Sequence, residues 1–328
     1  MLRGEFFAAA RSSAVADAPV GCTIEDQRLV IFRDEQGVPR ALADHCVHRG
    51  VPLSRGSVRN GCVECPYHGW RYDGAGRCVH IPDLQANKRI PTRAKVGSFR
   101  TLESDGFIWV QLEAARAPRW PLPLLQEVRG ANWRAVSHSR EVACDWRFMV
   151  ENVLDGSHLP FIHGGSLDKA GWFSFAWARG FRNGAAEAPP DLQVLENEAG
   201  FIASAESQLP DGGRRAFRFR MLLPSTVCVE LDRNSSQIRV WVHVVPTGPG
   251  RCRVEHVLHR NFLTFALADR LFLANARKIL GEDARAVELQ QRGYDRAGRD
   301  WEVSVLRDRL SLLFRRLVRS AGDPPAAV

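Results

Sequence analysis

The chain has 328 residues, which is enough for two domains, and its 45 basic against 37 acidic side chains give a net charge of +8. No cluster of Lys and Arg with interleaved aromatic residues accompanies this charge, so nucleic acid is excluded as an expected partner. No apolar run reaches the roughly eighteen residues that a membrane-spanning helix needs, and the cysteines show no regular disulfide spacing, so we expect a cytoplasmic protein without a membrane segment.

The first third of the chain, over residues 20–112, consists of short apolar or alternating runs that turn residues interrupt. One run, 28–32, precedes the turn Asp34–Gly37, and another, Arg71–Tyr72, precedes the turn Asp73–Gly76. Short runs with frequent turns between them are typical of strands. The pattern predicts an all-β domain.

Three prolines, Pro118, Pro121 and Pro123, lie close together after this region. Because proline lacks a backbone N–H and fixes φ, they interrupt regular structure and mark a linker. The predicted parts are a first domain, a second domain and a flexible tail, over residues 1–115, 116–320 and 321–328.

Two short motifs in the first domain carry metal-binding side chains, Cys46-x-His48 and Cys65-x2-His68. They offer two thiolates and two imidazoles, which is the ligand set of a Rieske [2Fe–2S] cluster, with both sulfurs on one iron and both imidazoles on the other. A structural zinc site also accepts this set, but its spacing usually pairs cysteine with cysteine. Each motif here holds one of each, so the [2Fe–2S] cluster is the favoured interpretation.

The residues around the two motifs also indicate the reduction potential. At the positions where high-potential Rieske proteins carry a disulfide clamp and a serine hydroxyl, this chain has Val51, Tyr67 and Trp70. We therefore expect a potential near the low end of the Rieske range, roughly −150 mV. Such a cluster is suited to donating electrons.

The second domain mixes helices and strands. Residues 145–159 predict a helix that ends at Pro160, and a long amphipathic stretch over 265–292 predicts another. Strand-like runs separated by Gly, Pro and Asp turns lie between them, at 201–208, 216–222, 227–231, 237–245 and 251–259. Strands followed by a long helix suggest an α+β fold, in which an antiparallel sheet wraps around the helix and leaves room for a cavity.

A second set of candidate metal ligands begins in the first of these helices, where Asn152, Asp155, His158 and His163 stand in the order Asn-x2-Asp-x2-His-x4-His. Two histidines and one carboxylate form the facial triad of mononuclear non-haem Fe(II). Asp283 is the candidate carboxylate, because helical spacing places it on the apolar face of the last long helix. A lone His-x4-His can arise by chance, and Asp283 can simply end the apolar face, so the upstream cluster is what favours an iron site.

Four segments together resemble the Rieske non-haem iron oxygenases, in the branch of terminal oxygenase components that includes dicamba monooxygenase and vanillate O-demethylase. They are Asp44–Gly50, Cys65–Trp70, Glu151–His158, and Glu282–Asp283 with the nearby Glu288 and Gln290. The resemblance covers nearly the whole chain. It implies a helix-grip (START-like) second domain, a [2Fe–2S] cluster, a mononuclear Fe(II) and a head-to-tail homotrimer.

The resemblance also implies a route for electrons and makes Asp155 and Asn152 the expected catalytic residues. Asp155 would join His68 of one subunit to His158 of the next. From the residues alone, Asp155 can accept the second ring N–H of His158, or it can be a solvated helix acid. No flavin or nicotinamide fingerprint follows any strand, so electrons would come from NAD(P)H through a separate reductase, with or without a ferredoxin.

The expected activity is that of a monooxygenase, which hydroxylates or oxidatively O- or N-demethylates an aromatic or heterocyclic small molecule with O2. The alternatives are cis-dihydroxylation by the same iron and a non-catalytic redox relay. In the strand 237–245, alternation places Trp241 and His243 on one face. If that face lines the cavity, these two side chains would contact a planar substrate, and the opposite face is an equal alternative.

Overall fold

The computed structural model describes residues 2–85, 87–122, 128, 132–163, 192–208, 214–298 and 301–320. The chain divides into two compact units. The N-terminal unit comprises Leu2–Leu124 and Pro246–Pro249, and the C-terminal unit comprises Leu125–Val245 and Gly250–Val328. The predicted domain boundary near residue 115 stays a prediction, and the predicted tail over 321–328 lies outside the described residues.

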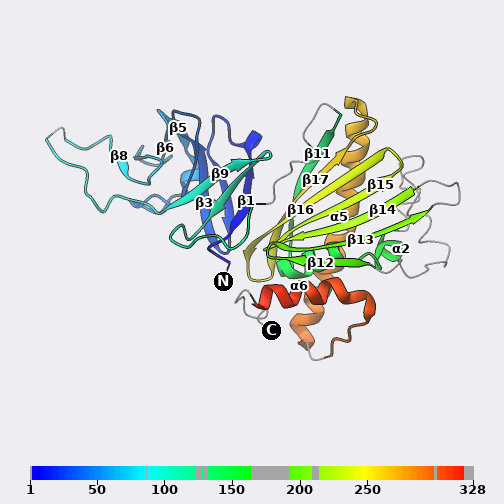
Figure 1. Cartoon of the computed structure of the whole chain (residues 1–328). Coiled ribbons are helices and arrows are strands. Elements are labelled where there is room, and N and C mark those ends of the chain that lie inside the picture. Colours follow the sequence, from blue (N-terminus) through cyan, green and yellow to red (C-terminus); the bar gives the residue numbers. More distant parts are fainter. Residues whose placement is uncertain are drawn as a thin grey trace. The chain divides into compact units, whose positions relative to one another are not determined.

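The N-terminal unit contains two antiparallel sheets (Figure 1). The six-stranded sheet has the order β1-β10-β9-β4-β3-β2, with β1 at Phe6–Arg11, β2 at Val20–Ile24, β3 at Gln27–Arg33, β4 at Pro39–Ala43, β9 at Ser98–Ser104 and β10 at Phe107–Gln111. The four-stranded sheet has the order β5-β6-β7-β8, with β5 at Ser57–Arg59, β6 at Cys62–Glu64, β7 at Arg71–Tyr72 and β8 at Cys78–His80. Two 3₁₀ turns, Ser12–Ala14 and Leu53–Arg55, are the helical parts of its described residues. The prediction of an all-β first domain is confirmed.

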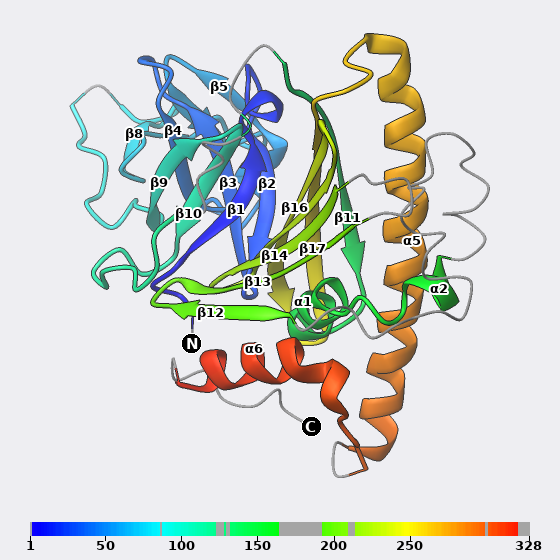
Figure 2. The ribbon, with the colours of Figure 1, turned by 45° about the vertical axis from the view of Figure 1, so that its right-hand side comes forward.

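A seven-stranded antiparallel sheet and a long helix dominate the C-terminal unit. The sheet has the order β11-β17-β16-β15-β14-β13-β12, with β11 at Arg134–Val142, β12 at Gln193–Asn197, β13 at Gly200–Gln208, β14 at Arg214–Leu222, β15 at Thr226–Arg233, β16 at Ser236–Gly248 and β17 at Arg251–Arg260. The helices are α1 at Trp146–Leu154, α2 at Leu159–Ile162, α5 at Ala266–Ala297 and α6 at Arg309–Ser320, with a 3₁₀ turn at Leu306–Asp308. Figure 2 shows α5 standing along β11. The predicted α+β arrangement is confirmed.

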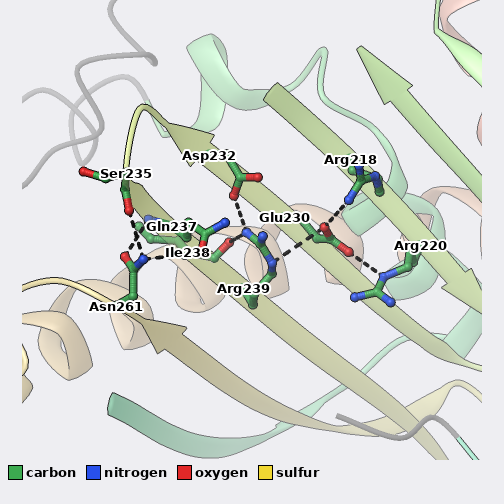
Figure 3. Close-up of polar contacts among 9 residues, drawn as sticks. All are labelled: Arg218, Arg220, Glu230, Asp232, Ser235, Gln237, Ile238, Arg239 and Asn261. Carbon is green, nitrogen blue, oxygen red and sulfur yellow. Dashed lines mark hydrogen bonds and ion pairs between the residues drawn. The ribbon is translucent and has the colours of Figure 1, made fainter. Parts of the chain in front are cut away.

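Strand alternation gives the C-terminal sheet two different faces. The inner face packs on α5, where Ile238 and Leu258 form a core cluster with Phe272. The outer face carries an ion-pair network that follows the strand register (Figure 3), because Arg218, Glu230 and Arg239 are direct neighbours across β14, β15 and β16. Among the helices of the described residues, none has both the length and the apolar character that crossing a membrane requires.

The predicted helix over 145–159 is wrong in one respect, because it is interrupted. Helix α1 ends at Leu154, and α2 begins at Leu159. The N–H of Ser157 donates to Asp155 Oδ1 at 2.7 Å, which is an Asx turn that competes with the helix. Pro160 does not end a helix either, since it lies in the first turn of α2, where its missing N–H costs no hydrogen bond.

Candidate metal centres

The two motifs of the N-terminal unit fold into loops with the same backbone pattern. In the first loop, Cys46 N–H donates to Val51 O at 2.9 Å, and Gly50 N–H donates back to Cys46 O at 2.7 Å. In the second, Cys65 N–H donates to Trp70 O at 2.8 Å, and Gly69 N–H donates to Cys65 O at 3.1 Å. Both glycines have positive φ, +74° and +67°, which a side chain would disfavour. The equal spacing from cysteine to glycine in the two motifs thus produces two loops with the same backbone hydrogen bonds.

The four candidate cluster ligands lie at the ends of these loops. Cys46 and Cys65 are buried, whereas His48 and His68 are partly exposed, and the two imidazole rings are 4.6 Å apart between centroids. The ring of Trp70 stacks on His48 at 4.7 Å. The cysteine side therefore lies in the core and the histidine side reaches solvent, as an electron-transferring cluster needs.

Tyr72 is a residue of this site that the sequence did not single out. Its hydroxyl lies 3.1 Å from Cys46 Sγ, and the tyrosine is fully buried. Burial, followed by the contact with Cys46, raises the pKa of Tyr72 well above its usual value, so the hydroxyl stays protonated and can donate to a thiolate.

In the C-terminal unit, three predicted ligands converge. One ligand atom from each of His158, His163 and Asp283 lies within 4.8 Å of the others. His163 Nε2 is 3.0 Å from Asp283 Oδ1, and His158 Nε2 is 3.4 Å from the same oxygen. Asp283 is 8% exposed, so helical spacing had correctly placed this carboxylate on the buried face of α5.

A second carboxylate stands behind each imidazole. Asp155 Oδ2 lies 3.5 Å from His158 Nδ1, and Glu282 Oε2 lies 2.9 Å from His163 Nδ1. Each ring thus has its Nδ1 atom turned to an outer acid and its Nε2 atom turned to Asp283. Such outer carboxylates orient metal-binding imidazoles and fix their tautomer. The role of Glu282 was missed, because nothing in the spacing indicates that two adjacent residues of one helix both face His163.

The two histidines flank the short helix α2, with His158 before its first residue and His163 after its last. Helical backbone bonds join them, from Ile162 N–H to His158 O and from His163 N–H to Leu159 O, both at 3.0 Å. Each ring nevertheless brings its Nε2 atom to Asp283 Oδ1. The break after Leu154 lies before both histidines.

The neighbouring charges in the C-terminal site shift the pKa values of His158 and Asp283. Burial lowers the pKa of His158, but Asp155 and Asp283 outweigh it and raise that pKa to about 9. Burial raises the pKa of Asp283, while His158 and His163 lower it further, so the net shift is downward. His158, His163 and Asp283 thus form a group of opposite charges that strongly affect one another's pKa.

The donor set suits a divalent metal ion. Asp283 Oδ1 is buried and makes no hydrogen bond among the described residues, although two imidazole nitrogens face it. A buried carboxylate oxygen without a hydrogen bond is costly unless a cation binds it. Two neutral imidazoles and one carboxylate on one side leave the other coordination positions open.

The remaining predicted site residues lie elsewhere. Asn152 is in the last turn of α1, where its carbonyl accepts the N–H of Asp155 at 3.2 Å. Trp241 and His243 lie on the outer face of the sheet, because they alternate with Ile238 and Val240, which pack on the α5 side. The structure therefore does not bring them beside Asp283. Their role in a substrate pocket stays a prediction that this placement does not support.

Two family models match the chain. Residues 5–99 match the Rieske [2Fe-2S] domain, and residues 142–323 match the vanillate O-demethylase oxygenase C-terminal domain. The second match covers more than half of the chain, so it defines the family.

Several curated proteins are similar in sequence. Protein TIC 55 of Arabidopsis thaliana is 35% identical over 148 residues, which are 45% of this chain and 28% of that protein. The oxygenase component of dicamba O-demethylase from Stenotrophomonas maltophilia is 35% identical over 163 residues, 49% of this chain and 48% of that one. Methylxanthine N3-demethylase NdmB of Pseudomonas putida is 28% identical over 321 residues, 93% and 84% of the two chains. The chain spans between about a quarter and a half of the length of the first two.

Solved structures share the fold. Pseudomonas putida NdmA, as a mutant with theobromine, superposes with a TM-score of 0.82 at 24% identity, over 97% of this chain and 90% of that one. Dicamba monooxygenase bound to dicamba superposes with a TM-score of 0.78 at 22% identity, over 98% and 97%. At these identities the likeness shows the fold.

Proposed function

We propose, on the premise that this chain belongs to the Rieske oxygenases with a vanillate O-demethylase type C-terminal domain, that it is the terminal oxygenase component of a multi-component cytoplasmic monooxygenase. It hydroxylates, or oxidatively removes a methyl group from oxygen or nitrogen of, an aromatic or heterocyclic small molecule. O2 is the oxidant, and NAD(P)H supplies electrons through a separate reductase, with or without a ferredoxin. The similarity to an O-demethylase and an N-demethylase supports this choice.

Each metal group has residues that suit it. A Rieske domain holds a [2Fe–2S] cluster, and the catalytic domain of this family carries a mononuclear iron. We assign the cluster to Cys46, Cys65, His48 and His68. We assign the iron to His158, His163 and Asp283, and when bound this iron supplies the oxidative chemistry with O2.

The outer acids keep the imidazoles ready for the metal. Glu282 accepts a hydrogen bond from the Nδ1–H group of His163, and Asp155 lies 3.5 Å from Nδ1 of His158, so each outer acid favours the proton on Nδ1 and leaves the Nε2 lone pair free to coordinate. Binding of a cation also offsets the negative charge of Asp283. Asp155 in addition joins His68 of a neighbouring subunit to His158 in a homotrimer, which gives electrons a short hydrogen-bonded path.

The observation that carries the proposal is the meeting of His158, His163 and Asp283 in the same chain as a Cys2His2 cluster motif. It disfavours a redox relay, because a relay has no use for a second metal site with open positions. Cis-dihydroxylation by the same iron is an outcome of the test below.

The test is substrate-dependent O2 uptake by the purified holoprotein with a surrogate reductase and a panel of methoxy- and methylamino-aromatics. Demethylation predicts formaldehyde in proportion to the O2 consumed, and hydroxylation predicts a hydroxylated product. A cis-diol identifies the dihydroxylase alternative. Cluster reduction without O2 uptake for any compound would leave only the relay.

A further inference from the structure

The segment that leads into α6 turns apolar side chains to the surface. Its residues 301–306 include Trp301, Val303, Val305 and Leu306, with exposed fractions of 52%, 85%, 61% and 88%. Single apolar side chains are common on protein surfaces, but four within six residues form a patch, and an exposed apolar patch marks an interaction site. Val303 and Leu306 are almost wholly exposed, so their side chains project outward.

Helix α6 continues this surface on its outward side. Its inward side is apolar and holds the buried residues Leu310, Leu313, Phe314 and Val318. Spacings of three and four residues place one exposed stripe on the outward side, which consists of Arg309, Leu312, Arg316 and Arg319. No Asp or Glu occurs in α6, so this stripe is basic with one leucine. Figure 1 shows α6 and the segment before it at the same end of the C-terminal unit, beside β12.

The arginines at the start of α6 do not serve the helix itself. Arg307 and Arg309 flank its first turn, where the helix dipole favours negative charge and disfavours positive charge. Asp308 between them is already engaged, since one of its carboxylate oxygens accepts the N–H of Val305 at 2.7 Å. No ion pair joins Arg307, Arg309 or Arg319 to another of the described residues. These three positive charges can therefore serve a partner.

The acidic residues near this surface leave it positive. Residues 301–320 hold five arginines and two acidic residues, which is a net charge of +3 out of the +8 of the whole chain. Glu302 pairs at 2.6 Å with Arg315, which is mostly buried and does not belong to the outward stripe. Glu196 of β12 pairs with Arg316, but both side chains are largely exposed, so water weakens this pair and an anion can replace Glu196.

The chemistry of this surface selects its partner. A lipid interface is fluid and accepts protruding Trp, Leu and Val side chains without a matching pocket, and anionic headgroups attract the arginines beside them. A hollow between α6 and β12 repeats the combination, since its lining mixes arginines with apolar side chains, namely Arg309, Arg316, Val194, Leu312 and Leu313. A second copy of this chain carries the same net charge of +8 and would be repelled. Nucleic acid would gain nothing from projecting aliphatic side chains.

We propose that residues 301–320 form a peripheral docking surface for anionic lipid, in which the apolar side chains of 301–306 enter the headgroup region and the arginines of α6 contact lipid phosphates. Binding of this kind holds a protein at a membrane surface without crossing it. The inference goes beyond the proposed oxygenase activity and does not depend on it. A position at the lipid surface would bring the enzyme to apolar compounds, which leave water for lipid.

The test is co-sedimentation of the purified holoprotein with vesicles of two compositions. One consists of phosphatidylcholine alone, and the other contains about 30% phosphatidylglycerol, which supplies negative charge. The variants are Leu306→Asp for the apolar part and Arg309→Gln for the basic part. Leu267→Asp is the matched control for leucine, because Leu267 is 69% exposed at the opposite end of α5, about 45 Å from the end that leads to this surface. Arg93→Gln, at an exposed arginine of the N-terminal unit, is the control for charge.

We expect the wild type to bind the anionic vesicles at least about tenfold more tightly than phosphatidylcholine, and the difference to shrink as salt is added, because ions screen the charged headgroups. Leu306→Asp should weaken binding to the anionic vesicles about tenfold or more, since it removes apolar area and adds a negative charge. Arg309→Gln should weaken it about fivefold, as for one basic residue near a charged surface. Leu267→Asp and Arg93→Gln keep the wild-type affinity.

Absence of vesicle binding by the wild type overturns the inference, and so does equal binding to the two compositions or a loss in Leu267→Asp that equals the loss in Leu306→Asp. Sedimentation velocity without vesicles gives the mass of each assembly. A changed mass in Leu306→Asp, with no vesicle binding by the wild type, makes the surface an interface between copies and also overturns the inference. Cluster absorbance and iron content confirm that each variant is folded, and Val303→Asp replaces Leu306→Asp if the latter does not fold. O2 uptake is not a readout here, so failure of the proposed oxygenase activity leaves the result unaffected.

Discussion

At the level of single residues, each imidazole of the C-terminal cluster stands between two carboxylates with different tasks. Asp283 faces both Nε2 atoms, while Asp155 and Glu282 face one Nδ1 atom each. Glu282 and Asp283 are adjacent in sequence, so the same helical turn supplies a ligand and the acid that orients another ligand.

The two neighbours should therefore respond differently to substitution. Asp283→Ala is expected to remove about one iron atom per chain and stop turnover while the cluster spectrum remains, because the two sites use separate residues. Glu282→Gln should keep the iron at saturation but weaken its affinity by about 10- to 100-fold. Metal analysis and Fe(II) titration measure both, and a fully iron-loaded Asp283→Ala protein would move the carboxylate role to Glu282.

Tyr72 should tune the cluster. A hydroxyl that donates to Cys46 Sγ stabilises the more negative, reduced state. Tyr72→Phe is expected to lower the reduction potential by about 40 mV, which corresponds to about 1 kcal/mol for a one-electron couple. Redox titration by EPR measures this shift. The same potential in both proteins, with equal iron and sulfide, would show that the hydroxyl does not donate to the sulfur.

At the level of elements, α6 is fixed to α1 by a buried ion pair. Arg315 donates to both oxygens of Glu151, at 2.7 and 2.6 Å, and Trp146 and Phe314 pack edge to face beside it. Glu151 is 7% exposed. Since α1 leads directly to Asp155, this pair connects the last helix to the metal site.

Removing one partner of that pair should be costly. Arg315→Met leaves Glu151 charged and buried, and we expect it to lower the free energy of unfolding by about 3 kcal/mol. The adjacent Arg316 pairs with Glu196 in an exposed setting, with side chains 61% and 47% exposed, so Arg316→Met should cost less than about 1 kcal/mol. Urea unfolding compares them, and equal losses would contradict the assignment.

Asp269, in the first turn of α5, forms ion pairs with Arg134 and Arg260 of the sheet, and the stability that these ion pairs contribute depends on pH. Arg134 and Arg260 lower the pKa of Asp269 to about 2, with Arg134 the larger cause. A lowered carboxyl pKa contributes stability above the ordinary value of 3.8, and this contribution is lost as pH falls through about 2. Asp269→Asn should thus be less stable than the wild type by about 1 kcal/mol at neutral pH, since solvent screens this partly exposed group. In urea unfolding, the difference in free energy of unfolding between the wild type and Asp269→Asn should narrow between about pH 4 and pH 2. A difference that does not change with pH would contradict this role of Asp269.

At the level of the whole molecule, the proposed trimer predicts that electron transfer to the iron requires two subunits. If the cluster of one subunit serves the iron of the next, inactive Asp283→Ala chains mixed with inactive His68→Ala chains should regain activity. In mixed trimers a sound cluster can then face a sound iron across an interface. O2 uptake by verified mixed trimers measures the recovery, and its absence would place electron transfer within one chain.

Asp155 is the proposed connection in that path. Asp155→Asn keeps the size of the side chain but loses its charge, so its hydrogen bonds to histidine weaken. We expect both metals to remain bound and the cluster to remain reducible, while cluster oxidation becomes slow and uncoupled from product. Stopped-flow oxidation with O2 and substrate checks this, and a normal oxidation rate would leave Asp155 as an orienting acid for His158 alone.

The sequence by itself determined the ligand types and much of the architecture. Cys-x-His and Cys-x2-His specify their chemistry locally, and period-two and period-3.6 patterns identified an all-β part, five strands and α5. The same periodicity placed Asp283 on a buried face, because a helix fixes the direction of each side chain from spacing alone.

Tertiary structure decided which distant residues meet. The contact of Tyr72 with Cys46 and the pairing of Glu282 with His163 join segments whose separation has no period. The face of β16 that meets α5 was likewise open in the sequence, since alternation defines two faces but does not say which one a helix covers. Long-range packing made that choice, and it turned His138 and His256 inward and Trp241 and His243 outward.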